Sequence, residues 1–383
     1  MKKIFLTTIT LLSMASASVF GMYGVDTDWI NFLTHGNQFR ARLDQLGFTL
    51  GNDTIKGTFG FDNNTGFGGA YGGLLVDNDG THYSFVPSIS MGLGYTSSLI
   101  SVGVGYSATI GKQIKKYNGG ATQDKTVNKS AHTPVLVLNA MDNAFRMAIP
   151  IQVYVDNDKL DGGGYDNKMA VSVDSQFRYY TGLDALPQVR LYLRYGLYQN
   201  ETKATKDAEK VKTKYGESFG FDFRLYFGSM VEEVALQPLV KLAYDGALGN
   251  YHANTRIQAV KAMNGDYATV NYGGGVWNLT LMTGLGLTAN SDIISLYLEP
   301  QLGLQVTRKA PTTSPDAGGT GAPTPASIAS DSYGLAYNVY AEIYITPLKN
   351  LEWYFEAQLG SGANQNSLVF NGTTGITWYL PAL

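Results

Sequence analysis

Apolar and polar residues alternate along much of the chain. In VRLYLRYGLYQN (residues 189–200), Leu191 and Leu193 fall on one face of a strand, whereas Arg190 and Arg194 fall on the other. The same alternation recurs in further segments at 145–155, 219–227, 294–306, 335–345 and 351–359. Runs of this length exceed the about five or six residues usual for strands of soluble proteins, and they suit the roughly 9–11 residues of a tilted membrane strand.

The connections between the alternating runs are short and long in turn. Short turns are expected near 96–98, 140–144, 181–186, 229–233, 288–292 and 347–350, and longer polar segments near 112–132, 156–168, 199–215, 246–272 and 309–331. Short turns at one end and long loops at the other are typical of outer-membrane barrels, whereas a Greek-key sandwich gives no reason for this order. The chain is therefore predicted to be all-β, a transmembrane antiparallel up-and-down β-barrel.

Strands can be counted back from the C-terminus at 366–380, 350–360, 332–346, 292–308, 273–288, 234–245, 216–228, 187–199, 168–180, 144–156, 133–140, 99–111, 82–95, 67–76 and 54–61. This number is odd, whereas single-chain bacterial barrels usually have an even number. A further strand at 45–51 (QLGFTLG) makes sixteen, with fourteen as the alternative. We therefore expect a barrel over residues 45–383, preceded at 22–44 by a short N-terminal helix or plug segment with Asp28 as its N-cap.

Residues 1–21 have the organisation of a secretory signal peptide. Two lysines precede an apolar stretch at 4–15, and small residues suited to a signal peptidase follow it. Cleavage is expected after Ala17 or after Gly21. The apolar stretch is too short to span a bilayer as a helix, so an exported protein is predicted.

The composition supports a membrane barrel. Charged residues make up 15% of the chain, against about 25% in an average soluble protein. The chain has 45 glycines, 26 tyrosines and 17 phenylalanines, yet its mean hydropathy is only −0.09, as expected when strands alternate between lipid and water. There is no cysteine, and the net charge of −3 argues against a nucleic-acid partner.

No motif in the sequence indicates catalysis, so the protein is not expected to be an enzyme. Residues 216–220 (GESFG) match a nucleophile elbow, but that motif needs a strand-to-helix turn, and here it leads directly into an alternating run. The four histidines are scattered and lack the spacing of metal ligands. We therefore expect no metal and no cofactor.

If the apolar faces meet lipid, a set of charged residues points into the barrel. The basic members are Arg146, Arg178, Arg190, Arg194, Arg224 and Lys241, and the acidic members are Glu299, Glu342, Glu352 and Glu356. Basic and acidic walls would face each other across part of the lumen, an arrangement that orients polar solutes and tunes ion selectivity. The alternative is that these groups pair with neighbours such as Asp174 and Asp222 and simply fill the interior.

Three N-terminal segments, MKKIFLTTITLLSMASASVFGMYG, DWINFLTHGNQFRARLDQLGFTLGN and TIKGTFGF, resemble the variable surface proteins (Vsp) of Brachyspira spirochaetes. Farther along the chain, the similarity is one of strand and loop style rather than of defined motifs. The resemblance implies an abundant outer-membrane protein, encoded in several related copies and exposed as a host-facing antigen. The family offers no catalytic residues to carry over. One departure from barrels generally is the ending TWYLPAL, in which Trp378 and Tyr379 are set back from Leu383 and weaken the expected assembly signal.

The residues and the resemblance together predict a major surface-exposed outer-membrane barrel protein and variable surface antigen at the host interface. The exposed, variable parts would be the long loops, since loops tolerate change where strands do not. A general diffusion porin with a charged lumen and a host-binding adhesin are the alternatives. The expected partners are outer-membrane lipid, the barrel assembly machinery, host immune factors, and further copies of the chain or related surface proteins.

Overall fold

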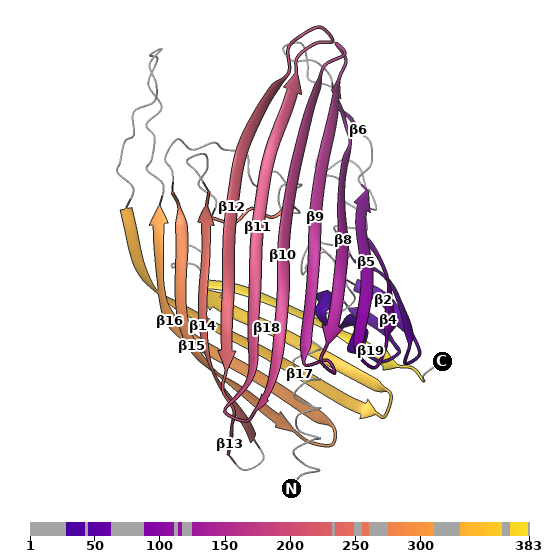
Figure 1. Cartoon of the computed structure of the whole chain (residues 1–383), viewed down its shortest axis with the longest axis vertical. Helices are drawn as coiled ribbons and strands as arrows, with labels where there is room; N and C mark the ends of the chain where they lie inside the picture. The colour runs from indigo at the N-terminus through magenta and orange to yellow at the C-terminus, as the bar shows by residue number, and fades with distance from the viewer. Residues whose placement is uncertain are drawn as a thin grey trace.

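The computed structural model describes residues 28–42, 45–62, 88–110, 114–116, 125–231, 234–248, 255–259, 275–309, 330–361 and 368–381. Sixteen antiparallel strands form a closed barrel (Figure 1), because the first strand, β1, pairs with the last strand, β19. This confirms the predicted sixteen-stranded, all-β architecture. The predicted signal peptide lies outside the described residues.

The ring consists of β1 (Gln38–Arg42), β2 (Gln45–Gly51), β3 (Ile55–Asp62), β4 (Ser88–Thr96), β5 (Ile100–Ile110), β8 (Lys129–Ala140), β9 (Phe145–Leu160), β10 (Tyr165–Leu183), β11 (Leu186–Lys203), β12 (Val211–Tyr226), β14 (Val234–Ala247), β15 (Trp277–Asn290), β16 (Ile294–Lys309), β17 (Ser330–Leu348), β18 (Leu351–Ser361) and β19 (Leu368–Tyr379). Three short strands add to it. β6 (Ile114–Lys116) pairs with β7 (Lys125–Val127), which joins β9, and β13 (Ser229–Val231) pairs with β14 beyond the end of β12.

The exterior of the barrel is apolar and its interior is polar. On β4, Ile89, Met91 and Leu93 are 41%, 50% and 58% exposed, whereas Ser88 and Ser90 on the alternate face are buried. A soluble sandwich would bury the apolar residues and expose the serines. The apolar exterior is therefore the surface that contacts lipid, and the side chains that alternate with it line the lumen.

The connections 52–54, 97–99, 141–144, 184–185, 227–233, 291–293 and 349–350 lie at one end of the barrel, and none of them is longer than seven residues. Asn37, just before β1, lies at the same end, because its carbonyl oxygen accepts a hydrogen bond from the backbone N–H of Leu380 at 2.9 Å. Its side-chain amide donates to the carbonyl oxygen of Gly51, also at 2.9 Å. At the other end, the structure describes the connections 161–164 and 204–210, and the strands that flank 43–44, 63–87, 111–128, 248–276, 310–329 and 362–367 end there as well.

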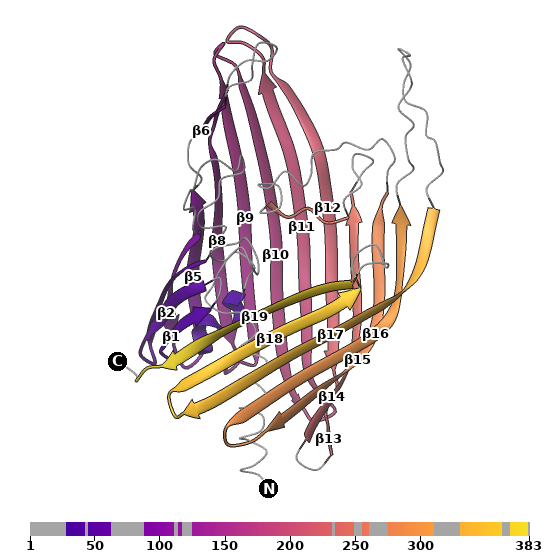
Figure 2. The ribbon, with the colours of Figure 1, turned by 180° about the vertical axis from the view of Figure 1, so that it is seen from behind.

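Strands β9 to β12 rise far above the rest of the barrel at this second end (Figures 1 and 2). The outward apolar residues stop at Val155 on β9 and at Met169 on β10, and the next outward residues are Asn157 and Asn167. Mainly polar residues on both faces place the upper part of these strands outside the lipid. We call this part the polar extension; it comprises residues 157–160, 165–168, 199–203 and 211–215.

The prediction of loops at 156–168 and 199–215 is therefore wrong for most of each segment. Their residues pair as strands, and only 161–164 and 204–210 connect them. The reason is physical: once both faces of a strand meet water, the apolar alternation disappears from the sequence, although the backbone hydrogen bonds continue.

The barrel also begins earlier than expected. Strand β1 lies within the segment 22–44, for which a helix or plug is predicted, and it pairs with both β2 and β19. The strand predicted at 67–76 lies outside the described residues, and β3 pairs directly with β4, so β1 supplies the sixteenth strand. A 3-10 helix, η1 (Asp28–Thr34), precedes β1 and is buried inside the barrel.

Within the described ranges, no helix is both long and apolar enough to cross a membrane.

Candidate functional site in the barrel lumen

Five basic residues form a continuous row across neighbouring strands. The strand register pairs Arg146 with Arg178, Arg178 with Arg190, Arg190 with Arg224, and Arg224 with Lys241. All five belong to the lumen-facing set predicted from the sequence. Like charges that are directly opposite each other on adjacent strands are destabilising. The row therefore needs an explanation beyond the packing of the barrel.

Asp222 neutralises one end of this row, which we call the basic row. Its carboxylate accepts two hydrogen bonds from Arg224, both at 2.8 Å, and lies 3.4 Å from Nζ of Lys241. Asp222 is buried, and a bidentate guanidinium–carboxylate pair is among the stronger polar contacts of a protein interior.

Arg194 lies outside the basic row but shares Asp222 with it. It lies within ion-pair distance of Asp174 at 3.7 Å, Asp222 at 3.7 Å and Asp245 at 3.2 Å. The pairing expected with Asp174 and Asp222 is therefore present for this arginine. Arg194 is charge-balanced by residues of its own wall.

Helix η1 is bound at the other end of the basic row. The side-chain oxygen of Asn31 accepts hydrogen bonds from Nη1 of Arg146 at 3.0 Å and from Nη1 of Arg178 at 3.4 Å. Nζ of Lys56 donates to the carbonyl oxygen of Leu33 at 3.0 Å. Three cations from β9, β10 and β3 thus hold the helix against the barrel wall.

Four inward-facing glycines make room for η1. A Cβ atom added to Gly92 would lie 2.6 Å from the ring of Trp29, and one added to Gly103 would lie 3.1 Å from Cδ2 of Leu33. Gly94 and Gly105 are in similarly close contact with the helix. The rest of the contact is apolar and consists of Trp29, Ile30, Phe32 and Leu33 packed with Val135, Val137 and Ala148.

A second internal segment, residues 255–259, lies against β9 to β12 higher in the lumen. The backbone N–H of Ile257 donates to Oγ of Ser218 at 2.8 Å, and that of Ala259 donates to Oγ of Ser172 at 2.9 Å. Arg256 pairs with Asp174 at 2.5 Å. We call this the lumen segment. It packs on Tyr154, Ala170 and Tyr198, and Gly196 allows its close approach.

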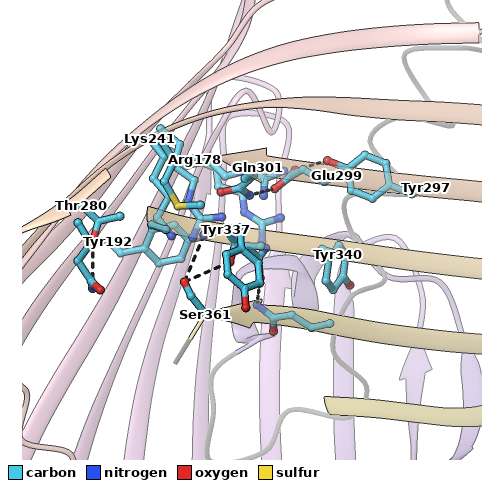
Figure 3. Close-up of a pocket in the computed structure, with 17 residues that line it drawn as sticks. Arg178, Tyr192, Lys241, Thr280, Tyr297, Glu299, Gln301, Tyr337, Tyr340 and Ser361 are labelled. Carbon is cyan, nitrogen blue, oxygen red and sulfur yellow. Dashed lines mark hydrogen bonds between the residues drawn. The ribbon is translucent and has the colours of Figure 1, made fainter. Parts of the chain in front are cut away.

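The basic row forms one side of a cavity of about 440 Å³. Arg178, Arg190, Arg224 and Lys241 all line it, whereas Glu299 contributes the only carboxylate among the described lining residues. Figure 3 labels Arg178, Lys241, Gln301 and Tyr337 among the lining residues, and dashed lines join Glu299 to Tyr297 and to Gln301. The remaining lining is mainly amide and hydroxyl side chains: Tyr192, Thr280, Gln305, Asn338, Tyr340, Gln358 and Ser361.

The four glutamates of the predicted acidic wall accept hydrogen bonds from tyrosine hydroxyls. Tyr297 donates to Glu299, Tyr340 and Tyr344 donate to Glu342, Tyr354 donates to Glu356, and Tyr379 donates to Glu352. Of the four, only Glu299 lines the cavity. Most of the acidic wall is therefore engaged with its own strands and stands apart from the basic row.

The chain belongs to the Serpulina hyodysenteriae variable surface protein family. The model of that family matches residues 2–379, and this confirms the resemblance inferred from the N-terminal segments. A comparison with curated proteins found no match.

The solved structures that match this variable surface protein are only distantly similar to it. The translocator domain of the autotransporter NalP from Neisseria meningitidis is 14% identical with a TM-score of 0.34, and the match covers 74% of this chain and 90% of that one. The transport unit of the autotransporter AIDA-I from Escherichia coli is 13% identical with a TM-score of 0.31, covering 96% and 97%. The open form of the ferric-catecholate import receptor Fiu from E. coli K12 is 10% identical with a TM-score of 0.42, covering 86% and 63%. The barrel assignment rests on the strand pairing of this chain.

Several residues of the lumen could not be assigned from the sequence. Asn31 lies in a segment without alternation, and Ser172 and Ser218 look like ordinary strand residues. Tyr192 and Tyr297 do fall on the polar face of alternating runs, and that signal could have found them. Among the residues that the structure describes, no group of three or more His, Asp or Glu side chains could hold a metal ion.

Proposed function

We propose that the protein is a surface antigen at the host interface and that the polar extension of β9 to β12 is its principal exposed structure. The family and the apolar exterior establish a barrel protein of the outer membrane. Barrels of this kind have short turns on the periplasmic side and longer connections outside the cell. The end that bears the polar extension is accordingly the outward one.

The observation that carries this proposal is the polar character of both faces of the extension. It stands clear of the lipid by roughly 15 Å, for five residues at about 3.3 Å each. A hydrogen-bonded four-stranded sheet gives an antibody a fixed surface, whereas a long loop without strand pairing would not.

Brief trypsin treatment of intact cells tests the proposal. We expect cleavage after Lys206 or Lys210, in the connection between β11 and β12, and none after Lys349, in the turn between β17 and β18 at the other end. Antibodies raised against residues 204–210 should bind intact cells, and antibodies against 181–186 should bind only after permeabilisation. Cleavage after Lys349 in intact cells would reverse the orientation and refute the proposal.

A second candidate function is a pore for small polar solutes. The charged cavity in the lumen supports it, but η1 and the lumen segment both occupy the same interior. Conductance of the purified protein in planar bilayers decides the matter: a protein that forms no pore is a display protein only.

A further inference from the structure

Arg190 occupies an unusual position at the centre of the basic row. Its register neighbours on both sides are arginines, Arg178 on β10 and Arg224 on β12. Asn31 accepts from Arg178, and Asp222 accepts from Arg224. Within the described chain, by contrast, Arg190 has no carboxylate partner, and its Nε atom has no hydrogen-bond acceptor. Its contact is with the ring of Tyr226, whose centroid lies 4.6 Å from Cζ.

Such an arrangement is costly in the absence of a counter-ion. A guanidinium group inside a barrel is removed from bulk water, and its neighbours on both adjacent strands repel it. Packing alone would favour a leucine, a glutamine or a paired arginine at this position. The cost is explained if the counter-ion is a ligand that enters the cavity.

The charges of the cavity indicate the valence of that ligand. Four cations line the cavity, and two carboxylates offset them: Glu299 in the lining and Asp222 behind Arg224 and Lys241. The excess is two positive charges. A phosphate monoester carries about −1.5 to −2 at pH 7, and the planar fork of arginine matches phosphate oxygens in a bidentate geometry.

The rest of the lining indicates what the phosphate is attached to. Gln301, Gln305, Asn338 and Gln358 bring amide groups that can both donate and accept. Nε2 of Gln301 donates to Glu299 at 2.5 Å, but its buried Oε1 has no donor among the described residues. The rings of Tyr192, Tyr297, Tyr337 and Tyr340 line the cavity beside these amides, so a hydroxylated ring would find both hydrogen-bond partners and ring faces to contact.

We propose that this cavity is a binding site for a small hydroxylated phosphate ester, with Arg190 as the residue that the phosphate neutralises. The site is independent of the surface-antigen proposal. It is also compatible with a closed lumen, since binding requires access to the cavity and not passage through the barrel.

Calorimetric titration of the full-length protein, folded in detergent micelles, tests this site. Glucose 6-phosphate is the probe, with inorganic phosphate and glucose as comparison ligands. We expect saturable binding of glucose 6-phosphate that weakens as salt is added, weaker binding of inorganic phosphate, and no binding of glucose. No saturable binding of glucose 6-phosphate at low ionic strength overturns the site, and equal binding of inorganic phosphate overturns the assignment to an ester.

Variants of Arg190 separate a binding residue from a structural one. Arg190→Gln should weaken glucose 6-phosphate binding at least tenfold while leaving the unliganded barrel as stable as the wild type or more stable, because two like-charge contacts are removed. Arg190→Lys keeps the charge without the fork and should bind with intermediate affinity. It is also the variant of choice if the glutamine form fails to fold.

Arg42→Gln is the matched control, because Arg42 faces the lumen from β1, lies over the ring of Tyr354 and does not line the cavity. Its affinity for glucose 6-phosphate should equal that of the wild type. The proposal fails if Arg190→Gln binds as the wild type does, or if it destabilises the unliganded barrel to the same degree as it weakens binding.

Discussion

A Cβ atom on Gly105 would lie 2.5 Å from Cζ3 of Trp29, a distance that no side chain can occupy. Gly105→Val should therefore displace η1 from its seat while the strand β5, which tolerates valine well, keeps its pairing. The iodide-accessible part of the Trp29 fluorescence, taken as the difference from the corresponding Trp29→Phe protein, should increase severalfold.

Gly57→Val is the matched control for this displacement. Gly57 lies on β3, which is separated from β5 by β4, and a Cβ atom added there would lie 3.8 Å from the carbonyl oxygen of Gly92, an ordinary contact. The valine there should leave Trp29 shielded. Equal quenching in both variants would mean that η1 is not held by the glycine contacts.

The hydrogen bonds to Asn31 give a second prediction. Asn31→Leu leaves Arg146 and Arg178 without this shared acceptor inside the barrel. The free energy of unfolding should fall by about 2–3 kcal/mol, because two buried donors lose one of their acceptors. Urea unfolding in lipid vesicles measures the change, and Asn290→Leu, at the exposed end of β15, should alter it by less than about 0.5 kcal/mol.

Displacement of the lumen segment should expose a new protease site. Gly196→Val would bring a side chain within 2.7 Å of Cβ of Ile257, and so it should release Arg256 from Asp174. Trypsin should then cleave the folded barrel after Arg256, a bond that is protected in the wild type. Ser107→Ala, which alters an inward serine on β5 that is bonded to Ser90, should leave the protection intact.

Asp156 should make stability depend on pH. It lies on β9 just beyond Val155, the last outward apolar residue, and burial, followed by its contact with Asp158, raises its pKa to about 6 from the ordinary 3.8. The folded state thus binds a proton more tightly than the unfolded state. The free energy of unfolding should rise as the pH falls through 6 and should level off near 3.8.

Replacement of Asp156 by asparagine tests the sign. Asp156→Asn should be more stable than the wild type at pH 8, by about 1–3 kcal/mol, and the difference should shrink towards pH 5. Asp207→Asn, in the exposed 204–210 connection, controls for the loss of one negative charge. A variant that is less stable than the wild type at pH 8 would show that ion pairing with Lys129 outweighs burial.

The sequence predicted the strands wherever one face met lipid and the other met the lumen. It failed for β1, whose five residues are too few for alternation to stand out beside the apolar run of η1. It predicted loops in the polar extension, where no regular apolar alternation marks a face. The alternation placed the six basic residues on the inward face of their strands, but it does not give their height along the barrel axis. The register that aligns five of them required the strand pairing.

The contacts of the lumen segment could not be predicted from the sequence, for a different reason. Its hydrogen-bond partners, Ser218 and Ser172, are 39 and 87 residues away in the chain. No local pattern encodes such a contact, and the residues themselves are ordinary for a connection between strands.

In the polar extension, the backbone pairing sets the shape, and the outward side chains set the chemistry of the surface. Its outward side chains, among them Lys159, Glu201 and Lys212, contact neither lipid nor the packed interior, while the paired backbones of β9 to β12 hold the sheet in place. Replacing such side chains one at a time costs nothing in membrane insertion or lumen packing. The protein can therefore present a new chemical face on an unchanged scaffold, and an antibody selected against one version would meet the same outline with different contacts in the next.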